Sequence, residues 1–140
     1  MVSIVAVEDN PSDAQLLKQA LKSSQTEYKL TIFEDAVSAA EYLWNARTGA
    51  SQLIILDLKL PERSGLELLH KLKADKHLRR VPVVVFAGSD NPSDILSAYA
   101  LHANCYLLKK RSAAEHLRTL RTMLDFWVAT ACLPGQEAFE

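Results

Sequence analysis

The sequence has little of what a membrane-spanning or nucleic-acid-binding protein needs. No apolar run approaches the roughly 20 residues that cross a bilayer, and Met1 leads directly into a strand pattern instead of a signal peptide. The net charge is −1, so the chain carries no excess of basic residues for nucleic acid or an anionic lipid surface. We therefore expect neither a membrane nor a nucleic acid as partner.

Cysteine is also scarce, with only Cys105 and Cys132 in the chain. Two cysteines at this spacing provide neither a disulfide framework nor a zinc site, which fits a reducing, cytoplasmic location. Linkers, internal repeats and low-complexity segments are lacking as well. A chain of 140 residues is then expected to form one domain around one well-buried core.

What the sequence does contain is a regular alternation of short β-branched runs and longer segments with helical spacing. Strands are predicted at 3–7, 28–33, 53–56, 81–86 and 104–108. Helices are predicted from Pro11, over 36–47, after a loop that holds Pro61 and Gly65, from Pro92, and over 112–130. Such units predict a parallel sheet with helices on both faces. The expected fold is a flavodoxin-like (βα)5 doubly wound sheet, with strand order 2-1-3-4-5 and three α/β/α layers.

Charged side chains collect where the predicted strands end. Glu8 and Asp9 follow the first strand, Asp57 the third and Lys109 the fifth. Ligands of such sheets bind outside these carboxyl ends. Carboxylates that lie close together raise one another's pKa unless a cation neutralises them, and Mg²⁺ prefers oxygen ligands. The sequence thus predicts a Mg²⁺ site; the alternative is that these acids only cap a helix and a turn.

Four segments together resemble the receiver domain of two-component response regulators: VEDNPSD, LIILDLKLPERSGLELL, VPVVVFAGSDNPSD and ANCYLLKK. The resemblance implies a receiver domain over 1–124, followed by a helix end and arm over 125–140. Two further stretches, AYALHANCYLLKK and LDFWVATACLP, are similar to the single-domain response regulators that partner bacterial and cyanobacterial phytochromes. The implied function is a phosphorelay step, with a phytochrome-type sensor histidine kinase as partner.

The resemblance also implies residue roles. Asp57 would accept the phosphoryl group and Lys109 would pair with its oxygens. The Mg²⁺ ligands would be Asp9 directly, Glu8 through water, Asp57, and the backbone carbonyl of Lys59. The chemistry agrees, since phosphoryl transfer needs an in-line nucleophile and positive charge on the equatorial oxygens. A carboxylate is ionised at neutral pH and is a ready nucleophile.

One family feature is missing at the end of the fourth strand. Most receivers carry a threonine or serine hydroxyl there, whereas this sequence has Ala87, with Gly88 and Ser89 as candidate phosphoryl contacts. Tyr106 matches the aromatic switch residue of the family. With Ala87 beside it, the ring is expected to lie inward without phosphorylation; the alternative is an ordinary core aromatic.

The last predicted helix becomes apolar on nearly every side past Met123. A helix that is apolar on all sides is normally covered, either by its own domain or by a partner. Either its end folds back on its own domain, or Phe126 and Trp127 form a contact in a symmetric homodimer. No length remains for an output domain, so we expect the signal to leave through protein–protein contacts.

Two other functions compete with the phosphorelay step. A degenerate receiver would act as a phosphorylation-independent adaptor, for which Ala87 is the support. A small-molecule phosphatase would need a second acid near Asp57 and a cap domain. We expect a signalling protein that catalyses only its own phosphorylation and dephosphorylation. Four histidines lack ligand partners at useful spacing and are expected at the surface: His70, His77, His102 and His116.

Overall fold

A computed structural model of the chain describes residues 1–45, 51–61 and 64–134. It contains a five-stranded parallel sheet in the order β2-β1-β3-β4-β5, which confirms the predicted flavodoxin-like topology. The strands are β1 (Val2–Val7), β2 (Tyr28–Phe33), β3 (Leu53–Asp57), β4 (Val83–Ala87) and β5 (Cys105–Leu108). The α-helices are α1 (Pro11–Lys22), α2 (Ala36–Asn45), α3 (Ser64–Ala74), α4 (Pro92–Ala100) and α5 (Ala113–Leu124).

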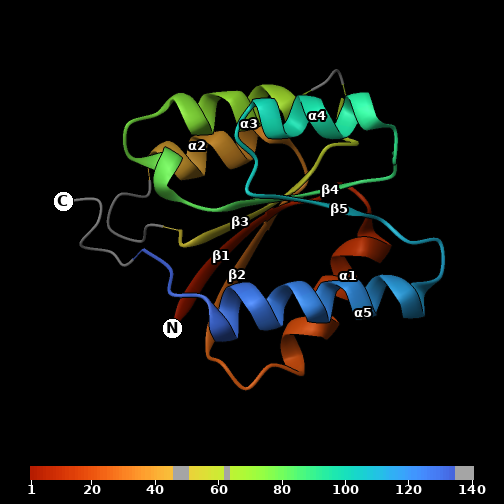
Figure 1. Cartoon of the computed structure of the whole chain (residues 1–140). Helices are drawn as coiled ribbons and strands as arrows, with labels where there is room; N and C mark the ends of the chain where they lie inside the picture. The colour runs from red at the N-terminus through yellow and green to blue at the C-terminus, as the bar shows by residue number, and fades with distance from the viewer. Residues whose placement is uncertain (46–50, 62–63, 135–140) are drawn as a thin grey trace.

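The helices form two layers, with α2, α3 and α4 on one face of the sheet and α1 and α5 on the other (Figure 1). Alternate residues of the central strands feed the two cores. In β3, Ile54 and Leu56 pack beneath α2 and α3, whereas Leu53 and Ile55 pack against α1 and α5. A strand that is covered on both faces reads as a continuous apolar run, which explains why LIIL shows no alternation.

The register of the parallel strands brings their carboxyl ends to one edge of the sheet. Val7, the last residue of β1, pairs with Phe33 and with Leu56, and Ala87 at the end of β4 pairs with Leu108. Residues that follow β1, β3, β4 and β5 therefore share a rim. Within the described ranges, no helix combines the length and the apolar character needed to cross a bilayer.

The predicted boundaries are wrong at one informative place. The sequence placed Gly65 in a loop, but α3 already begins at Ser64, so Gly65 lies in its first turn. A Cβ atom at Gly65 would lie 3.0 Å from the carbonyl oxygen of Asp57 and 3.0 Å from the Cα of Leu58. Glycine is present here because α3 packs directly against the backbone of the β3 end, and not because a turn requires it.

The end of the last helix packs on its own domain. After Leu124 the chain continues as a π-helical segment, Asp125–Thr130, in which Val128 is buried and Trp127 packs against the same core as α1 and α5. Phe126 is 54% exposed. The predicted helix over 36–47 is described as far as Asn45, and positions 135–140 of the predicted arm lie outside the described residues.

A glutamine side chain fastens this end of the chain to the sheet. The Gln52 side-chain amide donates a hydrogen bond to the carbonyl of Pro134 (3.0 Å), and its oxygen accepts one from the amide of Ser3 (3.2 Å). The segment that leaves α5 therefore returns to the amino-terminal ends of β1 and β3.

The close approach at Gly65 gives a stability prediction. Gly65→Ala is expected to lower the free energy of unfolding by up to about 2 kcal/mol, because overpacking costs about 1–3 kcal/mol and the helix propensity of alanine offsets about 1. Gly88→Ala is the matched control, since a Cβ there meets no atom within 4 Å. Urea unfolding of both variants measures the difference; equal midpoints would show that the α3 contact does not constrain the β3 end.

Candidate functional site

The turn after β1 orients two acids. Asn10 caps α1, its side-chain oxygen accepting hydrogen bonds from the amides of Ser12 (2.9 Å) and Asp13 (3.2 Å). The Asn10 amide in turn donates to the carboxylate of Glu8 at 3.2 Å. Pro11 starts the helix at the position where its missing N–H is harmless. The chain therefore leaves β1 in a tight turn that holds Glu8 and Asp9 at the rim.

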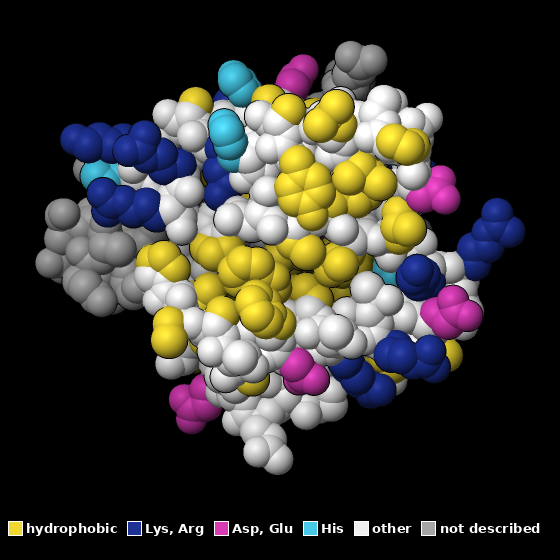
Figure 2. Space-filling view, viewed as in Figure 1, with side chains coloured by type: hydrophobic (Ala, Val, Ile, Leu, Met, Phe, Trp, Pro, Cys, Tyr) yellow, Lys and Arg dark blue, Asp and Glu magenta, His cyan; other side chains and the backbone are white. Residues whose placement is uncertain are grey.

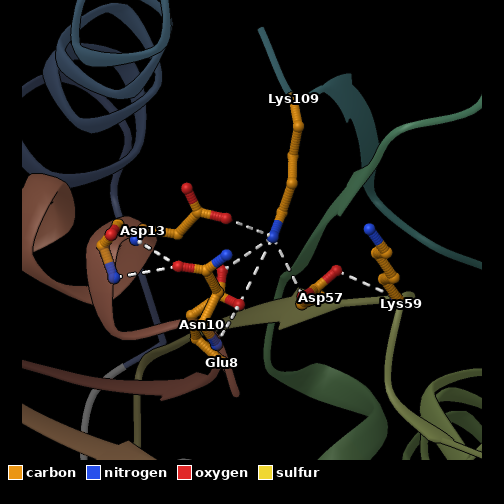
Figure 3. Close-up of polar contacts among 7 residues, drawn as sticks. Glu8, Asn10, Asp13, Asp57, Lys59 and Lys109 are labelled. Carbon is orange, nitrogen blue, oxygen red and sulfur yellow. Dashed lines mark hydrogen bonds and ion pairs between the residues drawn. The ribbon is translucent and has the colours of Figure 1, made fainter. Parts of the chain in front are cut away.

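Lys109 joins three acids from three different elements (Figure 3). Its Nζ lies 3.0 Å from Glu8 Oε1, 2.7 Å from Asp13 Oδ2 and 3.0 Å from Asp57 Oδ2. The sequence correctly placed Glu8, Asp57 and Lys109 at one rim. It missed Asp13, which lies in the first turn of α1, where an acid is ordinarily explained by the helix dipole.

Asp57 is buried, with a side chain only 2% exposed. Its Oδ1 accepts a hydrogen bond from the backbone amide of Lys59 at 2.9 Å, and its Oδ2 is held by Lys109. The two contacts orient the carboxylate at the end of a rigid strand. This arrangement holds both oxygens of an ionisable group in fixed directions at the rim of the sheet.

The electrostatics of the rim are unbalanced toward negative charge. Burial raises the pKa of Glu8 to about 7, together with a hydrogen bond to Asp57 and the charge of that group, and Lys109 offsets only part of this rise. Burial alone would lower the pKa of Lys109, but hydrogen bonds to Asp13 and Asp57 and the charge of Glu8 raise it above its ordinary value. A lysine that stays charged cannot neutralise all of these acids.

The donor set fits a divalent cation. Glu8, Asp9 and Asp57 each offer one carboxylate oxygen, and these oxygens lie within 4.8 Å of one another. Opposite ligands of an octahedral Mg²⁺ lie about 4.2 Å apart, so small side-chain adjustments would complete the site. Lys59 lies beside this group because its backbone amide donates a hydrogen bond to Asp57, and the role of its carbonyl as a ligand stays a prediction.

Ala87 leaves the end of β4 without a hydroxyl, and Ser89 is engaged elsewhere. The Ser89 hydroxyl donates to the carboxylate of Asp94 and accepts from the amide of Asn91 at 3.1 Å. If the Ser89 hydroxyl donated to a phosphoryl group, its hydrogen bond to Asp94 would have to break. Gly88 lies between the two residues, and contact with a phosphoryl group stays a prediction for both Gly88 and Ser89.

Tyr106 lies inward. Its ring packs against the core beneath α2, α3 and α4, and its hydroxyl donates to the carbonyl of Ser89 at 2.8 Å. It borders an open groove of about 560 Å³ that Lys59, Ala87 and Ser89 also line. The effect of Ala87 on this ring and a switching role for Tyr106 stay predictions.

The surface prediction is wrong for one histidine. His70, His77 and His102 are exposed, but His116 is only 3% exposed. Its ring stands edge-on to Phe86, with ring centroids 5.5 Å apart. The spacing of apolar residues in α5 gave no signal for it, because a histidine does not count as apolar in a helical pattern.

Comparisons with known proteins give the family. The model of the response regulator receiver domain matches residues 4–121. Response regulator Rcp1 of Synechocystis sp. (strain ATCC 27184 / PCC 6803 / Kazusa) is 36% identical over 136 residues, which covers 94% of this chain and 92% of that protein. A probable methanogenesis regulatory protein, FilR2 of Methanothrix harundinacea (strain 6Ac), is 33% identical over 135 residues, 94% of this chain and 87% of that protein.

Solved structures agree. The Mn²⁺-bound form of Rcp1 has a TM-score of 0.91 at 34% identity, covering 96% of this chain and 100% of that chain. The phosphorylated cyanobacterial phytochrome response regulator RcpA has a TM-score of 0.90 at 36% identity, covering 96% of this chain and 99% of that chain. The chain therefore belongs to the response regulator receiver domain family and is a signalling protein related to phytochrome response regulators.

Proposed function

We propose that Asp57 accepts a phosphoryl group from a phosphohistidine of a sensor kinase, over a receiver domain that spans 1–124. The observation that carries the proposal is the double hold on this carboxylate, by Lys109 on one oxygen and by the Lys59 amide on the other. In the transfer, an Asp57 oxygen attacks phosphorus, the P–N bond breaks and the imidazole leaves. The product is an aspartyl phosphate.

Lys109 is the residue placed to stabilise the charge of the transferred group. Its Nζ is already 3.0 Å from Asp57 Oδ2, and Asp13 and Glu8 hold it there. Preorganised charge of this kind stabilises phosphoryl transfer because it needs no rearrangement during the reaction. A divalent cation, for which we propose Mg²⁺ on Glu8, Asp9, Asp57 and the Lys59 carbonyl, would neutralise the remaining negative charge at the reacting oxygens.

The kinase partner is proposed to be of the phytochrome type, in the cytoplasm. The support is the likeness to RcpA, which is described as a cyanobacterial phytochrome response regulator. The adaptor function is not favoured, because the acceptor, the lysine and the acid cluster are all assembled. Ala87 is expected to weaken the coupling of phosphorylation to Tyr106, since a ligand shifts a population only by its differential binding.

A homodimer through the end of α5 is proposed as part of the output. Hydrophobic side chains gather between α4 and α5 on one face of the molecule (Figure 2). Cys105, Leu107, Met123, Phe126 and Trp127 border a groove of about 380 Å³ on α5 and β5. Phe126, exposed beside this groove, is the residue expected to enter the interface.

The acceptor is tested by Mg²⁺-dependent labelling with acetyl phosphate, followed by intact-mass spectrometry. The wild-type chain should gain one phosphoryl group, and Asp57→Asn should gain none because its amide is no nucleophile. Asp125→Asn, an exposed acid beyond the end of α5, should label like the wild type. Labelling that persists in Asp57→Asn would exclude Asp57 as the acceptor.

Cation binding should be linked to a proton on Glu8. The pKa of Glu8 is about 7 before the cation binds. As the pH increases toward 7, the affinity for Mg²⁺ should therefore increase by up to about tenfold per pH unit, and above pH 7 it should level off. Without the cation, the contribution of Glu8 to stability is present below its unfolded pKa and is lost as pH rises through about 7.

Isothermal titration calorimetry in buffers of different ionisation enthalpy measures the released proton. Glu8→Gln should bind more weakly and lose the pH dependence, whereas the exposed Glu67→Gln should keep both the affinity and the dependence. A pH-independent affinity in the wild type would remove the proton linkage.

The dimer is tested with Phe126→Lys, which should convert a dimer to a monomer in sedimentation velocity because a lysine cannot be buried there unpaired. Val37→Lys is the control, since Val37 is 70% exposed on α2, across the sheet from α5. A monomeric wild type, or a dimer that survives Phe126→Lys, contradicts the proposed interface.

A further inference from the structure

A small cavity lies beneath the acid cluster, between the sheet and helices α1 and α5. Its volume is about 20 Å³. Four polar residues border it, Glu8, Asp13, Asp57 and His116, and the remaining walls are hydrocarbon or aromatic. The acids of the rim therefore also border a space on the core side of the site.

His116 borders this space and contains a buried ring nitrogen that has no partner among the described residues. The residue is 3% exposed, and its buried Nδ1 has no hydrogen-bond partner among the residues that the structure describes. The edge-on contact with Phe86 fixes the ring, so the nitrogen cannot turn out to solvent without losing that packing. Buried polar atoms without partners are costly and therefore rare in folded proteins.

The cavity has the size and the chemistry of a water site. A buried water needs about 10–15 Å³ and between two and four polar partners. The volume meets the first condition, and the residues His116, Glu8, Asp13 and Asp57 that border the space offer partners for the second. Burial lowers the pKa of His116, and although the charge of Asp13 opposes this, the ring is neutral at pH 7. A water can donate to or accept from either tautomer of a neutral ring.

Asp13 is the carboxylate to which such a water would donate a hydrogen bond. Its Oδ2 holds Lys109 at 2.7 Å, the shortest of the three ion pairs, while Oδ1 accepts no hydrogen bond from the described residues. Both oxygens of Asp57 are already occupied. A hydrogen-bond donor in the cavity would hold the Oδ1 atom of Asp13. It would thereby keep Oδ2 directed toward Lys109.

We propose that His116 is a positioning residue of the phosphoryl site: its Nδ1 binds one buried water, which donates a hydrogen bond to Asp13 and keeps that carboxylate turned toward Lys109. The proposal rests on the function assigned above to Asp57 and Lys109. His116 touches neither the phosphoryl group nor the cation, and acts through Asp13 on the lysine that meets the transferred group.

Two substitutions separate this role from simple packing. His116→Leu fills the space with hydrocarbon and removes the nitrogen, whereas His116→Asn returns a polar atom near the position of Nδ1. We expect the rate of Asp57 labelling by acetyl phosphate to fall about three- to tenfold in His116→Leu, the loss expected for one hydrogen bond. The labelling rate of His116→Asn should lie within about twofold of the wild-type rate, because this variant can restore the hydrogen bond.

The two variants should rank in opposite orders for stability and for labelling rate. A role in packing alone would give the same order for both. Leucine in a buried site should unfold at higher urea than asparagine, while asparagine should label faster than leucine. If His116→Leu labels at the wild-type rate, or if both variants slow in proportion to their loss of stability, the positioning role is wrong.

A crystal structure of the wild-type protein at high resolution gives a readout that does not depend on phosphorylation. One ordered water should lie within hydrogen-bonding distance of His116 Nδ1 and of an Asp13 oxygen. A dry cavity would overturn the proposal even if Asp57 is labelled. If the wild-type chain takes up no phosphoryl group, the function proposed for Asp57 fails, and the water still decides the role of His116.

Discussion

The arrangement of the rim depends on one ammonium group shared by three carboxylates. Lys109 follows β5, whereas its partners come from the end of β1, from α1 and from the end of β3. These elements meet only if the strands keep their parallel register. The register therefore brings the ion-pair partners together, and the ion pairs in turn stabilise that register. In the low dielectric of a partly buried site, the contacts are strong enough to fix the Asp57 carboxylate before any ligand arrives.

The same interaction leaves the site in need of a cation. One lysine faces Glu8, Asp13 and Asp57, with exposed Asp9 nearby. Burial, with a further contribution from Asp57, raises the pKa of Glu8, and Lys109 offsets only part of this rise. The absent hydroxyl at Ala87 acts on a different part of the site. It leaves the acid cluster intact and lies on the groove that Tyr106 also lines. The proposed phosphoryl binding and its proposed transmission to the surface therefore depend on different residues.

The sequence predicted the sheet and most of the rim because both follow from simple patterns. Apolar runs identify strands, and polar residues that follow them must meet at one edge, which placed Glu8, Asp57 and Lys109 correctly. Asp13 and His116 were missed because both lie on helices, where position in the chain does not show which side chains reach the strand ends. Gly65 was misplaced because a close approach between α3 and Asp57 is a tertiary contact with no local signature.

The hydrogen bonds of Gln52 have a practical consequence for labelling the molecule. Because its side chain ties Ser3 to Pro134, the first strand starts and the described chain ends at the same pole of the sheet, away from the acids. An affinity tag joined before Val2 would begin at that pole, which is also where the described chain ends at Pro134. Such a tag would leave the mouth above Asp57 open to a kinase.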